Sequence, residues 1–273
     1  MVKERIDLLL VQKALCSSRE QAQRTIMAGH IFVNQERIDK PGTRVLTDAM
    51  IEVKGAVHPY VSRGGMKLAK ALEVFNLDVN GLTAIDVGAS TGGFTDCLLQ
   101  NGANLVYAVD IGYAQLAWKL RQDERVIEME RCNFLQLTDD DLKHGQPQFA
   151  TVDVAFISVC KIFPNLKKIL APLGYAAVLI KPQFEAGKAK IGKKGLVKDI
   201  LVHQEVLENV ICEARSIGFS VLALDFSPIK GGRTGNVEFL ALLYAGLSID
   251  TNINISEVVR RAHLEVGNVT DRR

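Results

Sequence analysis

The sequence predicts an α/β domain with a mostly parallel seven-stranded sheet, preceded by a small α+β domain. From residue 63 onward, short apolar runs alternate with stretches of helical period, which is typical of parallel strands joined by crossover helices. The last two runs, 219–226 and 237–244, are joined by a turn-rich connection too short for a crossover helix, so we expect these strands to be antiparallel. A length of 273 residues suffices for one large domain and one small one.

Composition and charge limit the kinds of function to consider. The chain is 48% apolar and 23% charged with a net charge of +2, values of an ordinary globular protein that do not by themselves indicate nucleic acid. No apolar run approaches the roughly 20 residues of a membrane span, and the N-terminus lacks a signal-peptide core. We therefore expect a cytoplasmic protein with no membrane partner. The five cysteines show no C-x-x-C spacing, so we expect reduced thiols and no metal site.

The first domain is expected over residues 1–54. Apolar side chains at helical spacing predict a helix over 5–15, and a capping serine predicts a second helix from Ser17 to Ala28, which Gly29 stops. A strand is expected over 31–34, turns at 35–37 and 40–42, and a strand over 50–53.

This pattern resembles the S-four RNA-binding domain. The likeness is carried by Arg5-Ile6-Asp7, Ser18-Arg19-Glu20, Ala28-Gly29-His30-Ile31 and Lys40-Pro41-Gly42. In that family the second helix and the strand after it face RNA. The resemblance therefore implies phosphate contacts by basic side chains of this region, namely Arg5, Arg19, Arg24, His30 and Lys40. Taken singly, each is more often a solvated side chain, and only clustering on one face would make them an RNA footprint.

A linker is expected over 55–62, because Gly55 and Pro59 interrupt any helical period. The large domain is expected over 63–246. Residues 247–273 are expected to hold one amphipathic helical segment, 256–265, and a polar tail.

A glycine-rich stretch organises the large domain. The apolar run that begins at Thr83 ends on Asp86 and breaks into a loop containing Gly88, Gly92 and Gly93, and the next apolar run, 105–109, ends on Asp110. Glycines permit a tight turn and a close approach of the main chain to a ligand, and an acid at the second strand end suits ribose hydroxyls. A nucleotide-type cofactor site is therefore expected at the carboxyl ends of these strands.

The glycine spacing is G-x-x-x-G-G, whereas a pyrophosphate-binding fingerprint is G-x-G-x-x-G. Together with Asp86 it resembles motif I of the methyltransferases that use S-adenosylmethionine (SAM). That resemblance implies SAM as the cofactor, with contacts at Asp86, Gly88, Gly92 and Gly93 and the ribose on Asp110. Asn133, which follows the strand predicted at 126–129, is the candidate for holding the adenine.

The remaining elements follow from the same periodicities. Helices are expected at 68–77, 94–99, 114–120, 161–170 and 199–217, a surface helix start at 139–141, and buried strands at 150–159 and 174–180. A carboxylate inside a buried strand is costly, so Asp153 is expected at a strand's carboxyl end, above the cofactor crevice. The strand over 174–180 delivers Lys181 to the same rim.

A lysine-rich segment follows, with Lys188, Lys190, Lys193, Lys194 and Lys198 among three glycines. It is either a solvated loop or a loop that contacts the RNA backbone.

Four charged residues are thus expected on one rim: Lys67, Asp153, Lys181 and Glu238. Their contexts, Ser-Arg-x-x-x-Lys-Leu, Val-Asp-Val, Ile-Lys-Pro and Val-Glu-Phe, resemble the Lys-Asp-Lys-Glu tetrad of the FtsJ-like ribose 2′-O-methyltransferases. With the S-four module in front, residues 3–245 are similar to the TlyA family, historically called hemolysin A, whose members methylate cytidine ribose in ribosomal RNA. The resemblance implies that Lys181 activates the hydroxyl and that Lys67, Asp153 and Glu238 orient it.

Two other kinds of function remain in view. One is a catalytically inactive assembly factor that binds ribosomal RNA, and the other is the membrane-lytic protein that the older family name suggests. The four charged residues argue against the first, and the lack of an amphipathic or apolar membrane segment argues against the second. The expected partners are ribosomal RNA or ribosomal subunits. The sequence does not indicate the modified nucleotide or the oligomeric state.

Overall fold

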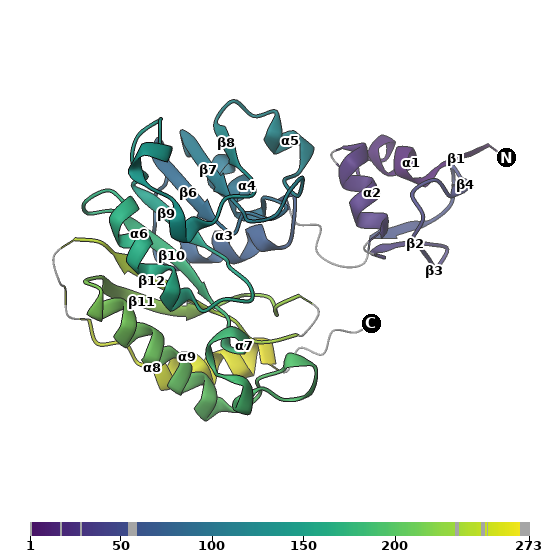
Figure 1. The fold of residues 1–273 in the computed structure, drawn as a ribbon. Helices are drawn as coiled ribbons and strands as arrows, with labels where there is room; N and C mark the ends of the chain where they lie inside the picture. The colour runs from purple at the N-terminus through teal and green to yellow at the C-terminus, as the bar shows by residue number, and fades with distance from the viewer. Residues whose placement is uncertain are drawn as a thin grey trace. The chain divides into compact units, whose positions relative to one another are not determined.

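The structure, a computed structural model, describes residues 2–16, 18–27, 29–53, 59–232, 235–246, 249 and 251–267 (Figure 1). The chain divides into two compact units, Met1–Pro59 and Tyr60–Arg273, each described by itself below. Of the linker expected at 55–62, residues 55–58 lie outside the described residues, as do Ser17 and Ala28 at the expected ends of the second helix. Val61 is buried in the second unit, where its backbone N–H donates to Asp96 (2.7 Å).

The N-terminal unit packs two helices against short strands. Its elements are β1 (Lys3–Arg5), α1 (Ile6–Gln12), α2 (Arg19–Met27), β2 (Ile31–Val33), β3 (Glu36–Ile38), β4 (Arg44–Leu46) and β5 (Ile51–Val53). β2 lies between β3 and β5, and β1 pairs with β4. The turn expected at 35–37 occurs earlier, at Asn34 and Gln35, which take the positive φ angles of a hairpin turn, and Glu36 and Arg37 already pair with β2.

The second unit is built on a seven-stranded sheet. Its strands are β6 (Thr83–Val87), β7 (Leu105–Val109), β8 (Val126–Met129), β9 (Phe149–Val152), β10 (Tyr175–Ile180), β11 (Ser220–Phe226) and β12 (Phe239–Tyr244). They lie in the order β11-β12-β10-β9-β6-β7-β8. β12 is antiparallel to both of its neighbours and the other pairings are parallel, which confirms the predicted fold class.

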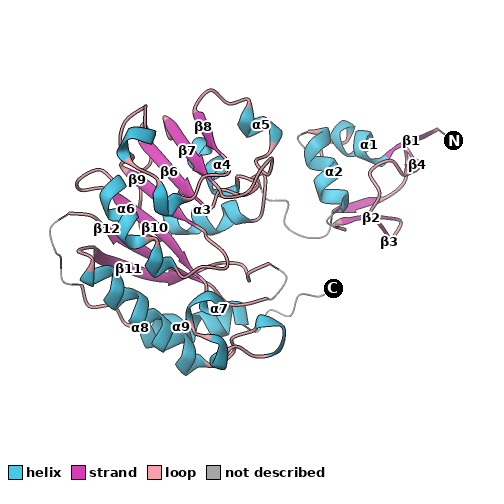
Figure 2. Cartoon of the chain, viewed as in Figure 1, coloured by secondary structure: helices cyan, strands magenta, loops and turns pink. Residues whose placement is uncertain are grey.

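Helices cover both faces of this sheet (Figures 1 and 2). They are α3 (Gly64–Val74), α4 (Gly93–Gln100), α5 (Trp118–Arg121), α6 (Phe163–Ile169), α7 (Pro182–Glu185), α8 (Ile200–Ser216) and α9 (Ile255–Ala262). One core cluster joins α3 and α4 to side chains such as Ala84, and the other joins α6, α8 and α9 to side chains such as Ile85. Successive strand residues point to opposite faces, so one strand contributes to both clusters.

Two expected elements of the large domain are shorter than predicted. The helix expected over 114–120 is reduced to α5, because Ala114 has a φ of 54° and Ala117 is extended. The strand expected over 150–159 ends at Val152, and Phe156 beyond it has a φ of 66°. The apolar run therefore continues past the sheet edge into an irregular segment, which brings Asp153 to the carboxyl end of β9, as predicted.

Candidate active site

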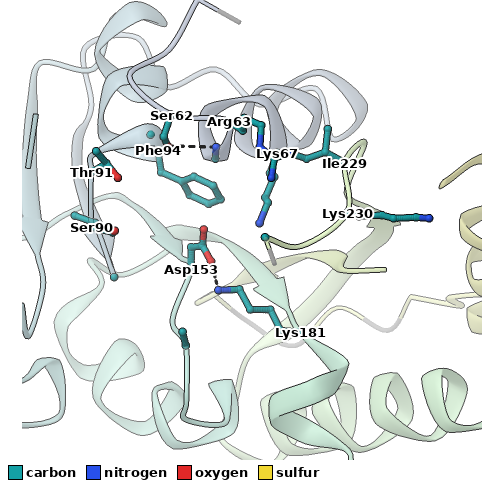
Figure 3. A pocket seen from close by; sticks show the side chains of 16 residues that line it. Ser62, Arg63, Lys67, Ser90, Thr91, Phe94, Asp153, Lys181, Ile229 and Lys230 are labelled. Carbon is teal, nitrogen blue, oxygen red and sulfur yellow. Dashed lines mark hydrogen bonds and ion pairs between the residues drawn. The ribbon is translucent and has the colours of Figure 1, made fainter. Parts of the chain in front are cut away.

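The carboxyl ends of β6, β9 and β10 lie side by side, because these strands are neighbours in the sheet and run parallel. A cavity of about 360 Å³ opens at this edge (Figure 3). Its walls come from the loop after β6, the start of α3, the segments after β9 and β10, and the connection between β11 and β12. Such a position, outside the carboxyl ends of parallel strands, is where α/β proteins bind ligands.

The four charged residues predicted on the rim come together here as two ion pairs. Lys67 Nζ donates to Glu238 Oε2 at 2.5 Å, and Lys181 Nζ lies 2.5 Å from Asp153 Oδ1. Lys67, Asp153 and Lys181 line the cavity, whereas Glu238 is reached through Lys67 and is 2% exposed. Figure 3 shows the lining side chains converging from different elements.

Local structure explains how Lys181 and Glu238 reach the edge of the sheet where the cavity opens. Lys181 precedes α7, and Pro182 at the first helical position ends the strand pairing there. Glu238 directly precedes β12, and Gly231 leaves space for its carboxylate, because a Cβ at Gly231 would lie 2.1 Å from Glu238 Oε1. The two ammonium groups and two carboxylates balance in formal charge, which makes their burial tolerable.

The glycine-rich loop contributes backbone to the cavity wall. Gly88 and Gly93 both line the cavity. Gly88 has a φ of 89°, and a Cβ there would lie 2.6 Å from the carbonyl oxygen of Asp153. A Cβ at Gly93 would lie 2.2 Å from Ser62 Oγ. Gly92 is not among the residues that line the cavity, and glycine is needed there for another reason: it precedes α4 with a φ of 92°, and a Cβ there would collide with Leu120.

Asp86, a predicted cofactor contact, is not among the described residues that line the cavity. Its side chain is fully buried and accepts hydrogen bonds from the N–H and Oγ1 of Thr95 and from Oγ1 of Thr151. Burial raises the pKa of this carboxyl to about 6, against the lowering effect of these hydrogen bonds. Asp86 therefore ties β6 to the first turn of α4 and to β9, and it holds the loop in place.

Asp110 and Asn133 also lie outside the residues that line the cavity. Asp110 follows β7 and accepts from the backbone N–H groups of Ser90 (2.8 Å) and Gly112 (2.6 Å). Ser90 lines the cavity, so Asp110 contacts the cavity wall through its hydrogen bond with Ser90. Asn133 is exposed, and its side chain accepts from the Leu135 N–H to begin a 3₁₀ turn. The structure does not bring Asn133 to the cavity.

An exposed aromatic side chain near the ion pair of Lys181 and Asp153 was missed in the sequence analysis. Phe156 is 93% exposed, and its ring packs against Phe184 at a centroid distance of 5.3 Å. Lys181 Nζ lies 5.9 Å from the Phe184 ring centroid. The apolar run around Phe156 predicted a buried strand, so the pattern carried no signal for an exposed ring. Arg63 and Lys230, which also line the cavity, were missed as well; Arg63 lies one helical turn before Lys67.

In the N-terminal unit, the buried carboxylate of Asp7 holds two of the predicted RNA-binding residues. Its oxygens lie 2.9 Å from Arg5 Nε and 3.0 Å from Arg19 Nε. Hydrogen bonding to Arg5 is the largest of the effects that hold the pKa of this carboxyl far below its ordinary value. Lys40 is exposed, whereas Arg24 and His30 are half-buried.

The lysine-rich segment of the second unit forms two 3₁₀ turns, Lys188–Lys190 and Lys193–Gly195. Lys188, Lys193 and Lys194 are exposed, and Lys190 forms an ion pair with Glu205.

The sheet, its antiparallel last strand and the glycine loop beside a charged cavity are those of a SAM-dependent methyltransferase fold. A family model described as FtsJ-like methyltransferase matches residues 60–244, and one described as S4 domain matches residues 4–51. The chain belongs to the FtsJ-like methyltransferase family and carries an N-terminal S4 domain.

Relatives with this arrangement are similar over most of the chain. "Putative rRNA methyltransferase YqxC" of Bacillus subtilis is 53% identical over 242 residues, 89% of this chain and 86% of that one. "16S/23S rRNA (cytidine-2'-O)-methyltransferase TlyA" of Mycobacterium tuberculosis is 38% identical over 242 residues, 88% of this chain and 90% of that one. The solved structure "Putative hemolysin from Streptococcus thermophilus" superposes with a TM-score of 0.75 at 51% identity and covers 97% of each chain. Within the part of this chain that the structure describes, every helix is too short or too polar to cross a bilayer.

Proposed function

We propose that this protein transfers a methyl group from SAM to the ribose 2′-hydroxyl of a cytidine in ribosomal RNA, and that it does so in the cytoplasm. The observation that carries the proposal is the pairing of Lys67 with Glu238 and of Lys181 with Asp153 beside one cavity. The name of the M. tuberculosis relative supports the choice of substrate, and the S4 domain supports an RNA.

The cavity has features that suit SAM. A volume of about 360 Å³ is within the range of small-ligand sites. Gly88 and Gly93 place main chain on the cavity wall, and a Cβ at either position would collide with Asp153 or Ser62, so this close packing of the loop requires glycine. Asp110, which is held by the N–H of Ser90, is the candidate for the ribose hydroxyls. Bound SAM supplies an electrophilic methyl group on a sulfonium centre.

The residues of this chain act on the hydroxyl that is methylated. A ribose hydroxyl is a weak acid, so attack by its oxygen is favoured when a nearby cation stabilises the developing negative charge. Lys181 carries such a cation at the cavity wall, and Asp153 fixes its position from 2.5 Å. Lys67 contributes a second ammonium group to the cavity wall, and its ion pair with the buried Glu238 fixes its position. We infer that positioning and electrostatic stabilisation by these groups supply most of the acceleration.

The exposed ring of Phe156 suits the nucleobase of the same nucleotide. A ribose inside a folded RNA can reach the cavity only if its nucleotide is unstacked, and that cost is offset when the base stacks on an aromatic ring. Phe156 is exposed and is braced by Phe184, which also neighbours Lys181. A base on this ring would place its ribose near the ion pair.

RNA outside the cavity would meet the basic residues of both units. In the S4 domain, Asp7 draws the guanidinium groups of Arg5 and Arg19 to one point, which turns two solvated arginines into a local cluster. In the second unit, the exposed lysines of the segment 188–194 would contact backbone phosphates.

The test is Lys181→Ala in the full chain, assayed with radiolabelled SAM and ribosomal subunits from cells that lack the enzyme. Removal of one preorganised electrostatic donor is expected to lower kcat by about 10²–10³-fold, while the Kd for SAM measured by calorimetry stays the same. Lys168→Ala, an exposed lysine on α6, is the matched control. Transfer at the wild-type rate by Lys181→Ala would refute the role of Lys181. A wild-type chain that binds subunits and SAM but transfers no methyl group would instead identify an inactive assembly factor.

A further inference from the structure

A second cavity lies next to the proposed active site. It has a volume of about 620 Å³ and is formed by the segment that leads into α8, by the connection between β11 and β12, and by the C-terminal helix α9 with the turn after it. Lys230, on the β11–β12 connection, lines both this cavity and the proposed active site. In Figure 3 its side chain extends away from Lys67 and Asp153. The two cavities therefore adjoin each other at Lys230.

The lining of the second cavity combines cations with apolar surface. Lys198, Lys230 and Arg260 contribute positive charge, and no acidic residue is among the described residues that line it. Arg260 is held in place by two hydrogen bonds to Glu257 on the same helix (2.8 and 2.7 Å). The apolar part is formed by Leu196, Val197, Ile200, Val237 and Leu264.

Two of these apolar side chains are exposed to solvent. Leu264 is 57% exposed and Ile200 is 44% exposed, so this rim of the cavity is open to a ligand. A nucleotide has the matching chemistry, because its base has apolar faces and its phosphate is an anion. Lys198 is the last lysine of the lysine-rich segment, so the positive charge of that segment continues along the surface to this cavity.

We propose that this second cavity binds a nucleotide that flanks the methylated one in the same RNA strand. The proposal rests on the proposed function and extends it: the connection carrying Lys230 separates the target nucleotide from its neighbour, whose phosphate is bound by Lys198 and Arg260 and whose base packs on Ile200 and Leu264. This site would bind the RNA strand next to the nucleotide that is methylated.

The experiment measures methyl transfer to ribosomal subunits and, separately, cosedimentation with them, for the full chain and its Arg260→Glu, Lys198→Glu and Ile200→Trp variants. Each charge reversal is expected to raise KM for subunits about tenfold and to reduce the slope of log affinity against log salt by about 1, with the Kd for SAM unchanged. Ile200→Trp, which narrows the cavity without changing its charge, is expected to raise the same KM. Lys168→Glu, an exposed charge reversal on α6, is the matched control.

The outcomes separate this proposal from the proposed function. If all three variants match Lys168→Glu in KM and in salt dependence, the second cavity does not bind the substrate strand. If they lose affinity for free cytidine monophosphate while KM for subunits stays at the wild-type value, the cavity is a mononucleotide site and the proposal is overturned. A wild-type chain that transfers no methyl group refutes the proposed function instead, and cosedimentation of the same variants still tests the cavity.

Discussion

The buried pair of Lys67 and Glu238 allows a quantitative test of the electrostatics of the site. Glu238→Gln preserves the shape of the side chain and removes its charge, so the Lys67 ammonium group faces a neutral amide. At 2.5 Å the attraction between the two charges is about 7 kcal/mol for an effective dielectric constant of about 20. The loss of solvation on burial offsets much of this attraction, and removal of one partner from a buried pair typically costs about 3–5 kcal/mol. Glu238 is 2% and Lys67 8% exposed, so we expect a loss of about 3 kcal/mol in the free energy of unfolding.

The assay is urea unfolding followed by circular dichroism, applied to Glu238→Gln, Lys67→Met and the double variant. Lys67→Met should be destabilised to a similar extent, because it leaves the Glu238 carboxylate without its cation. The double variant removes both charges, so its loss should fall short of the sum of the single losses by about 2 kcal/mol or more. Methyl transfer should fall in all three variants.

An additive result would refute this reasoning. If the double variant loses the sum of the two single losses to within about 0.5 kcal/mol, the two groups do not stabilise each other. Lys168→Met, at an exposed position on α6, controls for the loss of a lysine and should leave stability and methyl transfer unchanged.

Four further predictions concern other parts of the molecule. Phe156→Ala should lower kcat/KM for subunits about 10–100-fold through lost stacking while Phe156→Trp retains it, and an unchanged kcat/KM in the alanine variant would contradict a role in holding the base. Burial is the main cause that lowers the pKa of His203 from 6.5 to about 4, so as pH falls this side chain is protonated in the unfolded chain before it is protonated in the folded one. The difference contributes about 3 kcal/mol to the free energy of unfolding. This contribution is complete above pH 6.5 and is lost as pH falls toward 4. Urea unfolding at both ends of this range should show a steeper pH dependence for the wild type than for His203→Gln, and parallel curves would contradict it. Asp7→Ala releases Arg5 and Arg19 of the S4 domain and should weaken binding to ribosomal subunits. The slope of log affinity against log salt concentration, measured by cosedimentation, should also fall. An unchanged slope would exclude an RNA contact by these two arginines. Gly88→Ala places a Cβ 2.6 Å from a backbone carbonyl oxygen and should weaken SAM binding in calorimetry, whereas Gly81→Ala, which has a similar φ of 74° but open space around it, should retain the wild-type affinity.

Periodicity was sufficient to predict the fold of the large unit. Hydrophobic alternation reports which face of a segment is buried, and the short connection between 226 and 239 leaves no room for a crossover helix. Seven strands with an antiparallel last member follow from those two facts. The errors occur where an apolar run outlasts its element, as beyond Val152 and before Trp118, because a positive φ at Phe156 or Ala114 leaves no mark in the hydrophobic pattern.

The order of residues along the chain determines which charged groups stand at the carboxyl ends of strands, so the sequence alone identifies Asp153 and Lys181. It does not identify their pairing, because that depends on which strands become neighbours. Lys67 and Glu238 are 171 positions apart, and only the placement of α3 beside the start of β12 brings them together. The orientation of a side chain is equally a property of packing: Asp86 points between β6, β9 and α4, and the glycine pattern beside it does not reveal that direction. Periodicity depends on neighbours along the chain, whereas a binding cavity depends on neighbours in space, so the local pattern predicted the sheet and the three-dimensional packing determined the site.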